Sequence, residues 1–215
     1  MAINGDYIVV SAHYSDPSGS ASGAAYIFKK DEGGVDNWGQ IRKLVASDAY
    51  SNDLFSHGLD IYGDYIVVGA YGNDDNGSAS GSAYVFKKDE GGADNWGEIK
   101  KLRASDAAQS DQFGQNVAIN GDYIVISSHL DDDNGSASGS AYVFKKDEGG
   151  TDNWGEIKKL TASDAYSSDN FGERVDIYGD YIVVGAEDDD DNGSASGSVY
   201  TVSYTHLTLP TSPKV

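Results

Sequence analysis

The sequence predicts an all-β fold, a β-propeller made of four-stranded antiparallel blades, and three observations support this prediction. A GDYIV segment returns every 58 residues, at Gly5, Gly63, Gly121 and Gly179, so one structural unit is copied in tandem. Each copy contains four short segments with strand character. No stretch of ten or more residues shows helical periodicity. Short antiparallel strands in stacked, repeated units are typical of propeller blades.

The third copy illustrates the strands in order. The first is FGQNVAI from Phe113, the second DYIVISS from Asp122, and the third GSAYVFKK from Gly139. The outer strand is of the type WGEIKKLRA, which begins at Trp96 in the preceding connection. An Asn-Gly pair ending at Gly121 predicts a two-residue hairpin between the first two strands. The continuous apolar run of the second strand predicts a strand that is covered on both faces.

These repeats predict a single domain over residues 1–202, followed by a non-repeat tail. The expected blades span about 1–49, 50–107, 108–165 and 166–202. The tail, 203–215, is either foreign sequence or a closing strand in which Thr205–Leu209 completes the fourth blade. The chain is thus either a closed four-blade ring or a fragment of a larger propeller. An open array would expose apolar blade faces and favour self-association.

Composition excludes several functional classes. Asp and Glu number 35 against 15 Lys and Arg, a formal charge of −20, which repels the phosphates of nucleic acids and anionic membranes. There is no cysteine, hence no disulfide framework or thiol nucleophile. The apolar segments are too short to insert into a membrane. We therefore expect neither nucleic acid nor membrane insertion.

The repeated small residues carry a family resemblance. Phe-Gly begins one strand at Phe113 and Phe171, and Gly-Ala ends the next at Gly69 and Gly185. Over about residues 2–202, some 3.5 copies, the chain resembles the FG-GAP repeat family, which includes the propeller of integrin α subunits. The resemblance implies a secreted or cell-surface protein with a role in cell adhesion. Three sites depart from the pattern with serine: Ser11-Ala12, Phe55-Ser56 and Ser127-Ser128.

Acidic loops are the candidate metal site. The loops between second and third strands and the linkers between blades should emerge on one face and gather most of the carboxylates there. In the last copy Asp188, Asp190 and Asn192 stand at alternate positions before Gly193, a spacing of oxygen donors that suits calcium. The alternative is a solvated acidic loop that maintains solubility. The integrin-like calcium loop lies between first and second strands, a tight turn here, so the family's metal residues do not carry over.

Other features are ambiguous or negative. The Asn-Gly-Ser sequons at Asn76, Asn134 and Asn192 are either glycosylation acceptors or plain turn chemistry. The tryptophans repeated with Trp96 either pack between blades or offer stacking platforms for sugars. Histidines and serines lack the spacing of a catalytic triad or a nucleophile elbow, so we expect no enzyme.

Together these observations predict a non-enzymatic, extracellular binding or adhesion module. It would present an acidic loop face to a protein or glycan ligand, with calcium as a candidate cofactor. The alternative is that the propeller is the scaffold portion of a larger secreted hydrolase-type protein.

Overall fold

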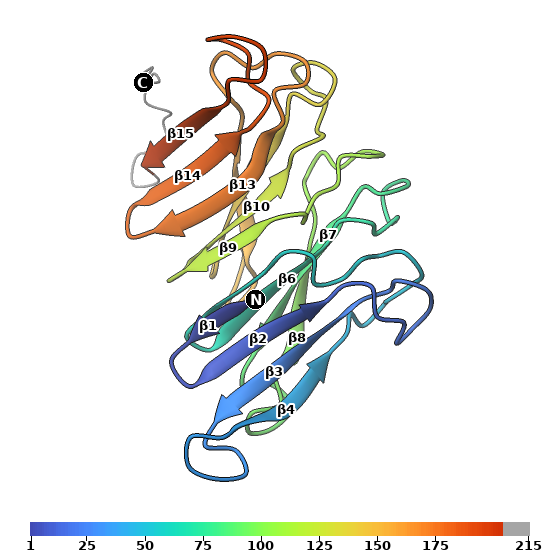
Figure 1. Cartoon of the computed structure of the whole chain (residues 1–215), viewed down its shortest axis with the longest axis vertical. Coiled ribbons are helices and arrows are strands. Elements are labelled where there is room, and N and C mark those ends of the chain that lie inside the picture. The colour runs from blue at the N-terminus through green and yellow to red at the C-terminus, as the bar shows by residue number, and fades with distance from the viewer. Residues whose placement is uncertain (204–215) are drawn as a thin grey trace.

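The computed structural model describes residues 1–203, which form four separate antiparallel sheets, one for each repeat (Figure 1). The first sheet contains β1 (Ala2–Asn4), β2 (Tyr7–Ala12), β3 (Ala24–Lys30) and β4 (Trp38–Leu44). The second contains β5 (Leu59–Tyr62), β6 (Tyr65–Ala70), β7 (Ser82–Lys87) and β8 (Gly97–Leu102). The third contains β9 (Val117–Asn120), β10 (Tyr123–Ser128), β11 (Ser140–Lys145) and β12 (Gly155–Leu160). The fourth contains β13 (Phe171–Tyr178), β14 (Tyr181–Ala186) and β15 (Ser198–Ser203).

Within each sheet the strands follow one another in chain order, each paired with the next. In the third sheet Ile124 of β10 lies opposite Ile119 of β9 on one side and Phe144 of β11 on the other. A tight turn at Gly121, whose φ is 60°, joins β9 to β10, as the Asn-Gly pair predicts. The meandering order confirms the predicted blade architecture.

The apolar core lies between the sheets. One cluster joins Val9 and Ile27 of the first sheet to Ile61 of the second. The next cluster joins the second sheet to the third, and the last joins the third to the fourth. This packing explains why the second strands read as continuous apolar runs, because β6 and β10 are covered on both faces.

The sheets form an open array. Figure 1 shows the first sheet at one end and the fourth at the other, with the second and third between them. The closed four-blade ring is therefore not formed by residues 1–203. The suggested closing strand, Thr205–Leu209, lies outside the described residues, and the fourth sheet has three strands within them.

The Phe-Gly motif joins neighbouring sheets. Phe113 is fully buried, and its amide donates to the carbonyl of Ser80, at the entrance to β7 of the preceding sheet. Its ring meets Tyr142 edge-on, with centroids 5.5 Å apart. In the second sheet Ser56 replaces the motif glycine with φ at 78°, and its hydroxyl donates to the carbonyl of Ala24 over 2.6 Å. A serine is thus tolerated there because it hydrogen-bonds to the preceding sheet.

The tryptophans pack between blades. Trp96 is buried and meets Tyr7 of the preceding sheet edge-on at 5.4 Å. Trp154 repeats this contact with Tyr65 at 5.3 Å. Trp38, whose sheet has no described predecessor, is only half-buried. At Trp96 and Trp154 the packing interpretation is confirmed and no sugar platform is available.

Candidate acidic loop face

The β2–β3, β6–β7, β10–β11 and β14–β15 loops lie on the same edge of the array as the linkers between sheets. The amide of Ser110, in a linker, donates to the carbonyl of Ser78 in the β6–β7 loop over 2.9 Å. Ser168 makes the same contact with Ser136, in the β10–β11 loop, over 2.8 Å. We call these loops and linkers the loop face. The two sets of segments therefore share one face, as expected from the sequence.

The acidity is less one-sided than the sequence suggested. The β3–β4, β7–β8 and β11–β12 loops, on the opposite edge, also carry acidic residues in every copy. They are Asp31, Glu32, Asp36, Asp89, Glu90, Asp94, Asp147, Glu148 and Asp152. Several of these have structural roles: Asp94 accepts a hydrogen bond from the Tyr7 hydroxyl at 2.6 Å and pairs with Lys29.

The loops of the loop face share one conformation. In the third sheet the amide of Gly135 donates to the carbonyl of Asp132 over 3.1 Å, and the amide of Asp133 donates to the side chain of Asp131 over 3.2 Å. The glycine turn recurs at Gly77 with Asp74 and at Gly193 with Asp190. Asx turns and glycines with positive φ explain why the Asp-Asn-Gly sequence folds this way. The loops therefore present the same shape three times.

A polar cluster around the buried carboxylate of Asp131 supports the loop of the third sheet. The carboxylates of Asp106, Asp131 and Asp133 offer oxygen atoms within 4.8 Å of one another. Asp106 comes from the linker, and the two others from the β10–β11 loop. The Tyr142 hydroxyl, from β11, lies 2.8 Å from both Asp106 and Asp131. Three acidic groups this close need positive charge to offset their repulsion.

Lys159 of β12 supplies that charge. Its Nζ lies 2.7 Å from Asp106, 2.9 Å from Asp131 and 2.5 Å from Asp133. Burial opposes the charged form, but these hydrogen bonds outweigh it and raise the pKa of Lys159. Burial, together with the negative charges of Asp131 and Asp106, raises the pKa of Tyr142. Lysine and tyrosine therefore both remain protonated donors at neutral pH.

This arrangement does not fit a metal ion. Three carboxylates so close together could ligate a cation, but an ammonium group with three N–H donors already meets all three. Calcium would have to displace Lys159 and find further oxygen ligands, since it takes six to eight. The cluster is thus an internal ion-pair network that fixes the loop. The second sheet repeats it with Lys101, which bonds to Asp48 at 2.6 Å and Asp75 at 2.5 Å.

Asp188, Asp190 and Asn192, the residues nominated for calcium, lie on the exposed part of the β14–β15 loop. Asp188 accepts a hydrogen bond from Asn170 at 2.7 Å. The buried carboxylate of this loop is instead Asp189, which accepts from Tyr200 at 3.0 Å. Sequence spacing did not indicate Asp189, although its match with Asp131 in the repeat register would have done so.

The linker carboxylates Asp53, Asp111 and Asp169 are buried. Each accepts a hydrogen bond from an amide three residues earlier; for Asp111 the donor is Ala108 at 2.7 Å. Burial, and the nearby charges of Asp131 and Asp132, raise the pKa of Asp111 to about 6. These groups close the linker turns and are not available to a ligand.

The histidines do not form a catalytic arrangement among the described residues. Ser11 lies 3.5 Å from His13, but its hydroxyl donates to the carbonyl of Ser56 at the sheet boundary. His129 lies 3.7 Å from Glu173, and burial, with Arg174 nearby, lowers its pKa to about 4. A neutral, buried imidazole of this kind is a packing group.

Comparison with protein families identifies the repeat. A family model described as FG-GAP repeat matches residues 1–28, 38–86, 96–144 and 154–202. The chain belongs to the FG-GAP repeat family. From the second match on, each FG-GAP repeat begins at the outer strand of one sheet and ends in the third strand of the next. The family unit therefore spans two blades and includes the linker that joins them.

No curated protein matches the chain. FG-GAP repeats are typical of extracellular proteins and form scaffolds that are typically non-catalytic. Within residues 1–203 there is no helix of the length and apolar character that a membrane span requires.

Proposed function

We propose that this FG-GAP module is a non-enzymatic, extracellular binding protein that uses the loop face to hold a partner protein with a basic surface. The observation that carries the proposal is the threefold display of one acidic loop. Asp74, Asp132 and Asp190 occupy the same position in the three Asp-Asn-Gly loops, and each is exposed. Asp16 occupies this position in the β2–β3 loop and is exposed as well. Repeated, rigid negative groups favour a partner with positive charge.

Rigidity supports this proposal. Each loop is closed by a glycine turn, the β6–β7 and β10–β11 loops are packed against the following linker, and the networks around Lys101 and Lys159 hold these two loops. A binding surface that is ordered before its partner arrives loses less entropy on association. Three equivalent loops on one chain also allow weak contacts to add by avidity.

The test compares two triple variants with equal loss of charge. Asp74→Asn, Asp132→Asn and Asp190→Asn together neutralise the loop face while keeping an oxygen acceptor at each position. The control is Asp31→Asn, Asp89→Asn and Asp147→Asn, which neutralises the same position in three loops of the opposite edge. Binding is measured by biolayer interferometry against a panel of purified basic proteins and an array of neutral glycans, at two salt concentrations.

We expect salt-sensitive binding to one or more basic proteins that falls at least tenfold in the loop-face variant and less than twofold in the control. Equal losses in both variants would mean that bulk charge alone is responsible, and would overturn the proposal. Binding to a neutral glycan that neither variant nor salt affects would also overturn it.

A calcium ion held by Asp188, Asp190 and Asn192 is a separate part of the proposal. It is supported by the alternate spacing of these three oxygen donors before Gly193 and by their exposure on the β14–β15 loop. If calcium binds, millimolar calcium raises the melting temperature above that in EDTA, because a ligand bound by the native state alone must stabilise it. The variant carrying Asp188→Asn and Asp190→Asn should lose that rise. An unchanged melting temperature in the wild type would leave a solvated loop as the explanation.

A further inference from the structure

Every contact between sheets joins two different faces. One, the forward face, is formed in the second sheet by Val67 and Ala83. The other, the backward face, is formed in the third sheet by Ile119, Phe144 and Trp154. These five residues are buried in one cluster. The same pairing of faces occurs between the first and second sheets and between the third and fourth.

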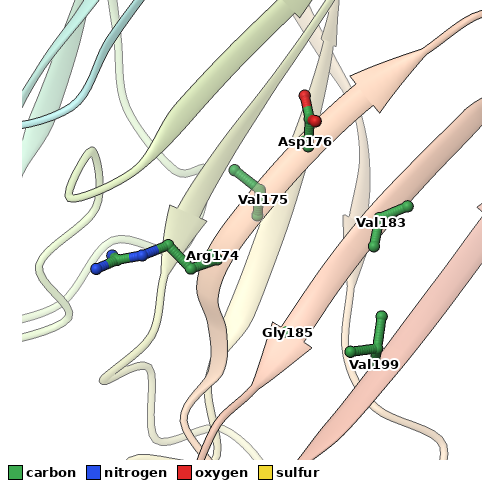
Figure 2. A pocket seen from close by; sticks show the side chains of 6 residues that line it. All are labelled: Arg174, Val175, Asp176, Val183, Gly185 and Val199. Atoms are coloured by element: carbon green, nitrogen blue, oxygen red, sulfur yellow. The ribbon is translucent and has the colours of Figure 1, made fainter. Parts of the chain in front are cut away.

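The forward face of the fourth sheet is open. Val183 and Val199, the counterparts of Val67 and Ala83, are 38% and 66% exposed, whereas Val67 and Ala83 are both 0% exposed. Figure 2 shows this surface on β13–β15, where a hollow of about 180 Å³ is lined by Arg174, Val175, Asp176, Val183, Gly185 and Val199. In the second sheet the counterpart of Gly185, Gly69, lies against the backbone of Gly114 from the third sheet. The hollow therefore lies where the following sheet contacts its predecessor.

The backward face of the first sheet is open as well. Ile3, the counterpart of Ile61 and Ile119, is 64% exposed, while those two are nearly buried. Phe28 and Trp38 are partly exposed, and their counterparts Phe86, Phe144, Trp96 and Trp154 are buried. The two ends of the array thus carry the two complementary halves of an interface that the chain itself forms three times.

We propose that a second copy of this chain docks the backward face of its first sheet onto the forward face of the fourth sheet, head to tail. The internal interfaces show that these two kinds of surface fit together. Apolar surface exposed at both ends supplies the driving force. Because the two faces differ, the contact is heterologous, and repetition of it closes a ring or extends a chain.

Polar groups at the two ends match in the same way. Between the first and second sheets the Tyr7 hydroxyl donates to Asp94 over 2.6 Å, and between the second and third Tyr65 donates to Asp152 over 2.6 Å. Tyr181 occupies the repeat position of Tyr7 and Tyr65 and is 58% exposed. Asp36 occupies the position of Asp94 and Asp152 and is exposed. In the head-to-tail contact Tyr181 of one copy would donate to Asp36 of the second.

Each internal boundary also carries a contact from the linker: at the boundary between the second and third sheets the amide of Phe113 donates to the carbonyl of Ser80. We expect association of two copies to depend on concentration in roughly the micromolar range.

The experiment uses analytical ultracentrifugation of the full chain and two charged variants at exposed sites. Val199→Arg disables the forward face of the fourth sheet, and Ile3→Arg disables the backward face of the first. Tyr50→Arg, at a linker residue 72% exposed and outside both faces, controls for added charge. Circular dichroism melting checks that each variant is folded.

We expect the wild type and Tyr50→Arg to associate with increasing concentration, and each face variant alone to stay monomeric. An equimolar mixture of Val199→Arg and Ile3→Arg should form a dimer, because each retains the face that the other lacks. A wild type that is still monomeric at about 100 μM, which implies a dissociation constant above the micromolar range, would overturn the proposal. Self-association of either face variant alone, or a mixture that stays monomeric while the wild type associates, would also overturn it.

Discussion

Gly69 of β6 lies against the backbone of Gly114, across the boundary between the second and third sheets. A Cβ atom added to Gly69 would lie 1.7 Å from the carbonyl oxygen of Gly114. A Cβ added to Gly114 would in turn lie 2.3 Å from the carbonyl oxygen of Ser82. The two glycines of the motif therefore allow the second and third sheets to approach backbone to backbone.

The close approach predicts that Gly69→Ala destabilises the protein. The methyl group would force the two sheets apart, at a cost of about 1–3 kcal/mol. The cost is limited because Ser127, at the same position of the third sheet, shows that the stack can adapt to a side chain. Chemical denaturation followed by tryptophan fluorescence measures the change in free energy of unfolding.

Gly185→Ala is the matched control. At this repeat-equivalent glycine the nearest atom to an added Cβ lies 3.8 Å away, so the change should stay within about 0.5 kcal/mol. Equal destabilisation by the two substitutions would show that backbone flexibility, rather than the contact between sheets, explains the glycines.

Trp154 and Trp38 should contribute differently to stability, because Trp154 is buried and Trp38 is only half-buried. Trp154 is fully buried against Tyr65, so Trp154→Ala should lower the free energy of unfolding by about 3–5 kcal/mol through the cavity it leaves. Trp38→Ala, at the open end of the array, should cost about 1 kcal/mol. Thermal melting of both variants is the measurement. If Trp38→Ala lowered the free energy of unfolding as much as Trp154→Ala, a partner would have to cover the Trp38 ring in solution.

Replacing Lys159 with an uncharged residue should create a calcium site. Lys159→Met removes the ammonium from among Asp106, Asp131 and Asp133 and should destabilise the protein by about 1–3 kcal/mol without metal, because the buried carboxylate of Asp131 loses its charged donor. Millimolar calcium should restore part of that loss in the variant, measured as a rise in melting temperature over EDTA. Lys158→Met, at the exposed neighbouring position, should show neither effect. A variant indifferent to calcium would mean that the three carboxylates cannot ligate it.

Asp111 predicts a pH dependence. Its folded-state pKa of about 6 lies above the ordinary value of 3.8, so the folded state binds the proton more tightly. The contribution of Asp111 to stability is therefore present below pH 4 and is lost as the pH rises through 6. Asp111→Asn should gain stability relative to the wild type, by about 1 kcal/mol or more, between pH 4 and pH 7. Urea denaturation across this range measures the difference, and a constant difference would contradict the raised pKa.

Much of the fold follows from local sequence, because the same turn, strand and motif sequences recur in each repeat and form the same structure. The Asn-Gly turn at Gly121, the apolar second strands and the motif at Phe113 each predict their own conformation. The candidate site was harder to predict from sequence. Spacing alone pointed to Asp188, Asp190 and Asn192, while Asp189 is the buried acid, because alternation within a loop does not reveal which side chain turns inward.

The sequence by itself determined the period, the strands and their order within a blade, since these depend on turns and on alternation between neighbours in the chain. Only the tertiary structure decided which carboxylates Lys101 and Lys159 neutralise, because those partners lie 26 to 53 residues away. It also decided that the described sheets form an open array. Closure depends on the accumulated rotation between sheets and on what covers the two end faces, and neither quantity is encoded in a single repeat.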